Sequence, residues 1–412
     1  MHKADESSIQ GRTKSGMDYY ILPQKDFGEK MAAVLVKAGA NHIFWKTPEG
    51  EQIEFPQGIA HFIEHKLFQQ KWGDAFTELT RQGAVANAFT DGEKTVYYFS
   101  CRESFMDNLK LLLDFVQNPY FTEEDTEKEK SIITSEITMY DDDPSWVVYY
   151  QMLEAMYGKH PIKNPVAGSA KTVGEVTAES LQAAYDAYYT TESIKLICTG
   201  DIPVKRVQMA AESVKKRETE LQPFFPEEED EILEKYRERK MGLQCPMFQI
   251  GFKLPPVKKG ERLRQRVAMG FVLELLAGES SPFFQKAYEK EFLDEPMGAA
   301  YFCGEGYAFA TFTATGRHPE EVAELLGKEL ERLKRDGFAW EDFQRIRKKM
   351  LGRFLRRLDS VNSLCMGQIE WAMEDATAAE MNRLIKSMPK EDAEKLLQNA
   401  LSVDTMVLSV VR

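Results

Sequence analysis

Cysteine is scarce in this sequence, and none of it lies in a C-x-x-C pair. Five cysteines are scattered over 412 residues, at positions 101, 198, 245, 303 and 365. An odd, dispersed set in a long chain argues against a disulfide framework and against a thiolate metal site. We therefore expect reduced cysteines that are mostly buried.

Long apolar runs and an excess of basic residues are also lacking. No run approaches the roughly 18 apolar residues that a membrane span needs. The polar start, Met1–Glu6, has no apolar signal core behind it. A formal net charge of −13 disfavours nucleic acid or an anionic membrane as a partner. We expect a soluble, cytoplasmic, globular protein, with 43% hydrophobic and 29% charged residues.

The length suits two domains of roughly 200 residues, and a weak internal repeat supports this division. Each half shows a strand, a turn, a second strand, an amphipathic helix and a long helix, and ends on a helix followed by a strand. The elements fall at 84–89, 91–92, 95–99, 106–116, 121–136, 178–189 and 194–198, and then at 299–302, 304–306, 307–313, 320–335, 338–358, 391–401 and 406–411. This order predicts an α+β fold of two tandem copies, each an antiparallel-rich sheet with helices packed on one face.

A proline pair and an acidic run mark the predicted boundary between the copies. Pro223, Pro226 and the acidic residues after it suit a solvated connection. We place the N-terminal domain at 1–222, the linker at 223–238 and the C-terminal domain at 239–412. An acidic binding segment is the alternative interpretation of the same run.

The string H-x-x-E-H at residues 61–65 is the strongest chemical signal. It lies in a predicted helix, 58–68, where His61 and His65 are four apart and share one face. Two imidazoles fill half of a tetrahedral zinc shell, leaving room for a carboxylate and a water. Glu64, beside that face, could take a proton from the water, whose pKa zinc lowers to about 7. The alternative is two surface histidines with an ordinary ion pair, although composition alone gives such a string in roughly one chain in a hundred.

A third ligand must come from another element, and the long helix after Phe121 offers two candidates. Glu129 and Glu136 are seven residues apart and therefore share a face. One could bind the metal while the other orients a histidine. Glu136 lies in a largely apolar stretch and needs a partner there, whereas the charged run 127–130 also fits a solvated surface.

The motif and its surroundings resemble the insulinase, pitrilysin and mitochondrial processing peptidase family, the inverzincins. The likeness covers essentially the whole chain and includes Asn87-Ala88 followed by Thr90. It implies that His61, His65 and Glu136 bind Zn²⁺, that Glu64 is the catalytic base and that Glu129 supports the site. The implied activity is that of a metalloendopeptidase hydrolysing unfolded peptides or protein segments. Cobalt or manganese could occupy the same ligands.

The resemblance also implies a substrate grip and an overall arrangement. Asn87, Ala88 and Phe89 would lie on an edge strand that pairs with extended substrate backbone; an ordinary core strand is a compatible alternative. Family members fold as a clam-shell around a chamber, with metal in the first domain alone. The helix predicted at 266–276 contains no histidine, so a single site is expected.

One departure from the family pattern concerns the second half. Where many active relatives carry an arginine and a tyrosine, this sequence has Tyr288 and the region of Asp294. Loss of that pair would weaken transition-state stabilisation, unless Tyr301 or Tyr307 substitutes. The same departure resembles a bacterial subgroup associated with aminopentanol modification of elongation factor P. Its members are paired with a paralogue lacking the zinc motif, which implies a possible heterodimer. The alternative function is thus a partner or maturation subunit with weak or no hydrolysis.

Overall fold

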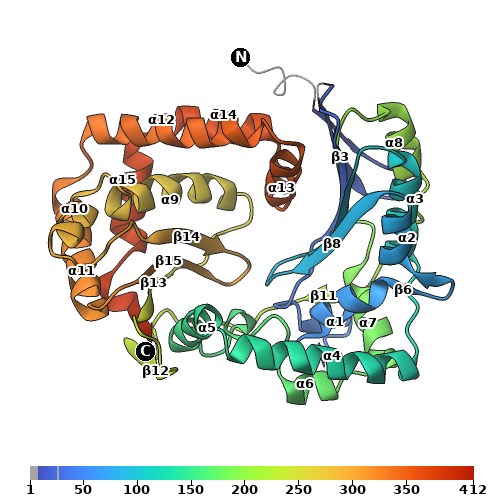
Figure 1. Ribbon diagram of the computed structural model, residues 1–412, viewed down its shortest axis with the longest axis horizontal. Helices are drawn as coiled ribbons and strands as arrows, with labels where there is room; N and C mark the ends of the chain where they lie inside the picture. Colours follow the sequence, from blue (N-terminus) through green and yellow to red (C-terminus); the bar gives the residue numbers. More distant parts are fainter. Residues whose placement is uncertain (1–7, 26) are drawn as a thin grey trace. The chain divides into compact units, whose positions relative to one another are not determined.

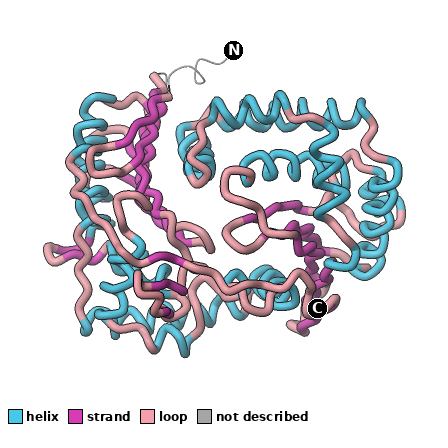
Figure 2. The backbone as a smooth tube through the Cα atoms, turned by 180° about the vertical axis from the view of Figure 1, so that it is seen from behind, coloured by secondary structure: helices cyan, strands magenta, loops and turns pink. Residues whose placement is uncertain are grey.

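The chain, seen as a computed structural model in Figure 1, is described over residues 8–25 and 27–412. The polar N-terminus noted above lies outside these described residues. Two compact units make up the chain. The first unit comprises residues 1–137, 164–224 and 355–380, and the second comprises 138–163, 225–354 and 381–412. Each is α+β, with strands and helices distinguished by colour in Figure 2.

The sheet of the first unit has six strands. Their order is β1 (Ile9–Arg12), β2 (Asp18–Pro23), β10 (Ile194–Gly200), β3 (Lys30–Val36), β9 (Thr95–Cys101) and β8 (Ala84–Thr90). Only the β2–β10 pair is parallel within this sheet. The strand β8 therefore forms one edge.

The sheet of the second unit repeats the last five of these positions. Its order is β12 (Tyr236–Arg239), β16 (Met406–Val411), β13 (Met247–Leu254), β15 (Ala308–Thr315) and β14 (Gly298–Cys303). Again the first pair, β12–β16, is parallel and the others are antiparallel. The shared order and directions confirm the predicted α+β fold of two related copies.

Helices surround both sheets, and short strands complete the first unit. In the first unit lie α1 (Ile59–Leu67), α2 (Ala75–Arg81), α3 (Phe105–Gln117), most of α4 (Glu123–Asp141), α6 (Ala170–Gly174), α7 (Ala178–Tyr188), α8 (Val204–Glu212) and α13 (Val361–Ala372). The second contains α5 (Pro144–Met156), α9 (Arg262–Ala277), α10 (Pro282–Glu289), α11 (Pro319–Asp336), most of α12 (Trp340–Arg357) and of α14 (Ala378–Ser387), and α15 (Lys390–Ala400). The short strands are β4 (Phe44–Lys46), β5 (Gln52–Glu54), β6 (Gln69–Gln70), β7 (Gly73–Asp74) and β11 (Gln222–Pro223).

Each sheet has one helix from the other half of the sequence on its second face. On β3, Ala32 and Val34 belong to the main core of the first unit, so the alternate residues Ala33 and Leu35 point to the opposite face. There α13 packs against β3 and β10 (Figure 1). These alternate residues are also fully buried. We predicted helices on one face of the sheet, and the structure has a helix on the second face as well.

The second sheet shows the reciprocal arrangement. Helix α5, from the first half of the sequence, packs against β13 and β16. At Gly251 the helix comes so close that a Cβ would lie 2.2 Å from the Cε of Met156. A larger residue in the middle of β13 would require the side chains of Met152 and Met156 to shift.

The predicted linker, 223–238, is more structured than a solvated connection. Residues 236–238 belong to β12, and the side chain of Glu228 is only 7% exposed. Glu228 accepts hydrogen bonds from the backbone N–H groups of Gly158, Lys159 and His160, and forms an ion pair with Lys253. The two domain bounds drawn on either side of this segment remain a prediction.

Two further sequence-based expectations concern cysteines and apolar length. All five cysteines are free, and all but Cys245 are buried, as predicted. Among the described residues, one helical stretch, Arg262–Glu289, is long and apolar enough to cross a membrane by length and composition alone. Of its most apolar window, 61% is buried, and α9 packs against β14 and α15. This is the pattern of a core helix.

Candidate metal centre

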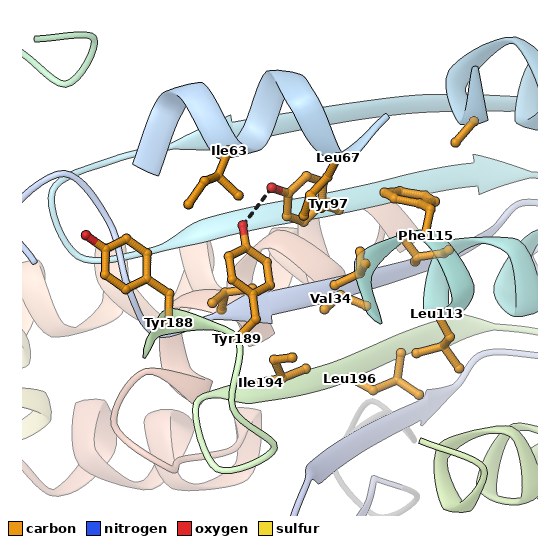
Figure 3. Packing of buried hydrophobic residues seen from close by; sticks show 14 of the residues in the cluster. Val34, Ile63, Leu67, Tyr97, Leu113, Phe115, Tyr188, Tyr189, Ile194 and Leu196 are labelled. Carbon is orange, nitrogen blue, oxygen red and sulfur yellow. Dashed lines mark hydrogen bonds between the residues drawn. The ribbon is translucent and has the colours of Figure 1, made fainter. Parts of the chain in front are cut away.

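Helix α1, which carries the motif, is held in place at its N-cap and along its apolar face. Its N-cap, Gly58, has a φ of 89°, and a Cβ there would lie 2.4 Å from the carbonyl oxygen of Ala167. A side chain at this position would be strained and crowded. Ile63 and Leu67 point into the core, above Tyr97 and Tyr189, whose hydroxyls are 2.7 Å apart (Figure 3). The next residues around the helix, His61, Glu64 and His65, are left at the edge of this core.

The structure brings the three expected ligands together. The Oε2 atom of Glu136 lies 3.8 Å from Nε2 of His61 and 3.6 Å from Nε2 of His65. One ligand atom from each of the three residues lies within 4.8 Å of the others. Two ligands of a tetrahedral zinc ion, each about 2.1 Å from the metal, are roughly 3.4 Å apart. The observed spacings fit such an ion with small adjustments of side-chain rotamers.

Glu129 occupies the orienting position. Its Oε1 atom is 3.0 Å from Nδ1 of His65, on the far side of the ring from Glu136. Its Oε2 atom accepts a hydrogen bond of 3.2 Å from Gln69, whose amide oxygen in turn accepts from the buried Lys66. The two glutamates thus have different places: Glu136 faces both imidazoles, and Glu129 contacts one of them.

Gln69 and Lys66 were missed by sequence reasoning. Gln69 follows His65 by four residues, and this helical spacing was a usable signal even though α1 itself ends at Leu67. Lys66 is fully buried, which no local pattern indicates for a lysine next to a histidine. Both belong to the chain of contacts behind Glu129.

The protonation state of His61 favours metal binding. Burial, reinforced by the nearby charge of His65, lowers the pKa of His61 to about 4, so its imidazole is neutral at pH 7. For His65, burial lowers the pKa, but the hydrogen bond with Glu129 and the surrounding carboxylates outweigh it and raise the pKa overall. The buried Nδ1 of His61 has no hydrogen-bond partner among the described residues. Orientation by a carboxylate is therefore seen for His65 alone.

Glu64 lies at the end of the edge strand β8. Its Oε2 accepts a 2.6 Å hydrogen bond from the hydroxyl of Thr90, the last residue of β8. Burial raises the pKa of Glu64 above its ordinary value, and the bond from Thr90 partly offsets that rise. A carboxylate of raised pKa is a stronger base than an exposed one.

The predicted substrate-binding residues lie along the same strand. β8 pairs only with β9 among the described strands, so its other side is an unpaired edge. Ala84 and Ala86 are buried, Asn87 is exposed, and Ala88 and Phe89 are half-buried. The backbone N–H of Ala88 donates to the side-chain oxygen of its neighbour Asn87, at 2.8 Å. The strand thus combines a core face with an open edge.

The residues at the sequence positions of the arginine–tyrosine pair lie in the second unit. Tyr288 on α10 is 60% exposed, and Asp294 is also exposed. The hydroxyl of Tyr301 accepts a hydrogen bond from Gln265, whereas Tyr307 is buried.

His160, in the loop before Pro161, is fully buried. Its Nδ1 accepts from the N–H of Ile162, and its Nε2 contacts the carbonyl of Glu305. The Pro161 that follows gave no hint of this burial.

Comparisons with known proteins point to one family over most of the chain. Residues 50–170 match the model of the insulinase family, peptidase family M16, and residues 175–350 match that of the M16 inactive domain. A Bacillus subtilis protein named uncharacterized zinc protease YmfH is 33% identical over 98% of this chain and 96% of its own length. A second, YmxG, is 28% identical over 76% of this chain and 78% of its own.

Solved structures show the same fold. An M16-like peptidase from Alicyclobacillus acidocaldarius superimposes with a TM-score of 0.93 at 29% identity, covering 98% of both chains. A protease from Helicobacter pylori gives 0.82 at 18% identity, covering 98% of this chain and 99% of its own. Together with the inverted motif and its grouped ligands, these matches establish that the chain belongs to the M16 (insulinase) peptidase family.

Proposed function

We propose that this protein is a zinc-dependent endopeptidase that hydrolyses unfolded peptides or protein segments. The observation that carries the proposal is the convergence of His61, His65 and Glu136 beside the buried carboxylate of Glu64. Relatives named zinc proteases support the choice of metal. The donor set, two imidazoles and one carboxylate, is typical of a catalytic zinc site that keeps one position open.

The roles of the residues follow from their positions. Zinc, when bound, supplies Lewis acidity toward a carbonyl oxygen and lowers the pKa of a water molecule to about 7. Glu64 accepts the proton of the attacking water at a carboxylate oxygen and passes it to the nitrogen of the leaving amine. Thr90 holds that carboxylate through its 2.6 Å hydrogen bond, and Glu129 orients His65.

The edge strand β8 offers a way to hold a substrate of varied sequence. An extended peptide could add to β8 through main-chain hydrogen bonds, which are largely independent of side chains. The exposed Val85 and Asn87 would lie beside it, and Thr90, at the end of the strand, contacts Glu64. A peptide paired along Asn87, Ala88 and Phe89 would therefore lead toward the catalytic base.

A partner or maturation subunit is the second candidate. The absence of the arginine–tyrosine pair at Tyr288 and Asp294 favours it, because transition-state stabilisation would be weaker. This alternative includes a heterodimer with a paralogue lacking the zinc motif and a role in modification of elongation factor P. A buried catalytic glutamate beside the ligands speaks for hydrolysis instead, since a scaffold has no need of it.

The decisive experiment compares wild type with Glu64→Gln, using the exposed Glu51→Gln as matched control. Zinc content is measured by elemental analysis, and cleavage of a mixed pool of unfolded peptides by mass spectrometry. We expect one zinc in all three proteins and cleavage by wild type and Glu51→Gln alone. Zinc in all three with no cleavage by any would support the partner role. Absence of zinc in wild type would refute the metal site.

A further inference from the structure

A cavity of about 830 Å³ lies in the first unit, away from the metal ligands. It is lined by α3, the end of α7, α8 and the segment after it, and α3 and α8 pack against each other on the sheet (Figure 1). Volumes of roughly 300–1,000 Å³ are typical of sites for small organic molecules. None of the residues assigned to the metal or to the peptide lines it.

The floor of this cavity is apolar and rigid. Buried side chains of Leu113, Tyr185, Tyr189, Ile194 and Val214 line it. Tyr185 and Tyr189 stack with ring centroids 4.5 Å apart, and their hydroxyls are bound to the carbonyl of Val116 and to Tyr97 respectively. Because these hydroxyls are already used and both rings are buried, the floor adds no free hydroxyl, and the exposed apolar side chain of the lining is that of Met209.

The rim is strongly cationic in a protein of net charge −13. Five of the lining residues are lysine or arginine, and one, Asp114, is acidic. Arg217 is bound to Asp186 and covers the Tyr185 ring, and Lys216 pairs with Glu218. The side chains of the other three, Lys110, Arg206 and Lys215, form no ion pair or hydrogen bond with any described residue.

Like charges gathered around one opening repel one another, and this repulsion is relieved by a bound anion. A free inorganic anion would pair with the cations of the rim and leave the apolar side chain of Met209 exposed to water. An uncharged apolar molecule would contact Met209 and leave the cations unpaired. The ligand that satisfies both has an apolar body and an anionic head.

We propose that this cavity is a binding site for a small amphiphilic anion, whose apolar body lies against Met209 and whose phosphate or carboxylate head is held by Lys110, Arg206 and Lys215. The site is separate from the peptidase site and does not depend on the proposed function.

Two fluorescent probes of nearly equal shape test the proposal. The first, 1-anilinonaphthalene-8-sulfonate, carries an anionic group, and the second, N-phenyl-1-naphthylamine, is its uncharged counterpart. We expect one molecule of the sulfonate per chain, bound at least five times more tightly than the amine. Equal affinity for both probes would overturn the proposal, because the rim would then play no part.

Matched variants locate the site. The double variant Lys110→Glu/Lys215→Glu should weaken sulfonate binding at least tenfold, with little effect on the amine. The exposed lysines of Lys171→Glu/Lys258→Glu give a control with the same change in net charge. Equal weakening in both double variants would refute the location.

One further variant should bind the sulfonate more tightly than wild type, a result that misfolding could not produce. Asp114→Asn removes the one acidic residue of the lining and should tighten sulfonate binding two- to threefold; no tightening counts against the proposal. Displacement of the sulfonate by decanoate or by adenosine diphosphate then identifies a carboxylate or a phosphate head. Displacement by neither overturns the assignment of the ligand class.

Discussion

Replacing Glu129 by glutamine tests the most specific contact of the candidate metal centre. The carboxylate accepts from two sides at once, from Nδ1–H of His65 at 3.0 Å and from Gln69 at 3.2 Å. Glutamine is isosteric but neutral and has a single acceptor oxygen, so one of the two donors would face an NH₂ group. The bond to His65 also loses its charge assistance.

The magnitude follows from these two losses. Exchanging a charged for a neutral hydrogen bond costs about 1 kcal/mol, and the donor left without an acceptor adds about 1 kcal/mol. A total near 2 kcal/mol corresponds to roughly a thirtyfold weaker zinc affinity, within the 10–100-fold range seen for groups that orient metal ligands.

The assay is competition for zinc against a chromophoric chelator at pH 7.5, for wild type, Glu129→Gln and Glu127→Gln. Glu127 is two residues away on α4, with its side chain 63% exposed, and its substitution should leave the zinc affinity unchanged. If Glu129→Gln binds zinc within threefold of wild type, Glu129 does not orient the ligand and our account of the site is wrong.

Three other predictions concern the base, the edge strand and the buried acid of the second unit. Thr90→Val removes a hydrogen bond that lowers the pKa of Glu64, so the acidic limb of the pH–rate profile for peptide cleavage should move to higher pH, while an unmoved limb would contradict the assignment. Ala88→Pro removes an N–H from the open edge of β8 and should raise KM for peptides at least fivefold without changing zinc affinity; an unchanged KM would exclude pairing there. Glu228→Gln should destabilise the protein by about 1–2 kcal/mol in urea unfolding at pH 7. Despite the opposing effect of burial, hydrogen bonds from three N–H groups and the charge of Lys253 lower the pKa of Glu228 to about 2. Because the pKa of Glu228 is depressed in the folded state, the stabilisation by its carboxylate is present above pH 4.5 and is lost as the pH falls toward 2. If wild type and Glu228→Gln differ in unfolding free energy as much at pH 3 as at pH 7, this reasoning is wrong.

Much of this structure was accessible from local pattern. The elements predicted around the motif correspond to α1, β8, β9, α3 and α4, because hydrophobic periodicity and turn residues act over short distances. The choice between Glu129 and Glu136 as the metal ligand came from the family resemblance and not from local pattern. Residues seven apart share a face, and only the offset of α4 along α1 decides which carboxylate meets which side of His65.

Long-range contacts account for the remaining differences. An amphipathic pattern shows that a helix has an apolar face, but not which sheet will cover that face. The packing of α5 on the second sheet and of α13 on the first was therefore invisible. The burial of Glu228 and His160 depends on partners tens to more than a hundred residues away, Lys253 and Glu305.

The reciprocal placement of α5 and α13 has a consequence for biosynthesis. During translation, the first sheet can form its strands by residue 200, but its second face, with Ala33 and Leu35, stays open until α13 has left the ribosome. A nascent chain thus carries an uncovered apolar surface for some 170 residues of further synthesis. By the same logic, two fragments made by cleavage after residue 224 would each lack a covering helix and should re-associate with one another rather than fold alone.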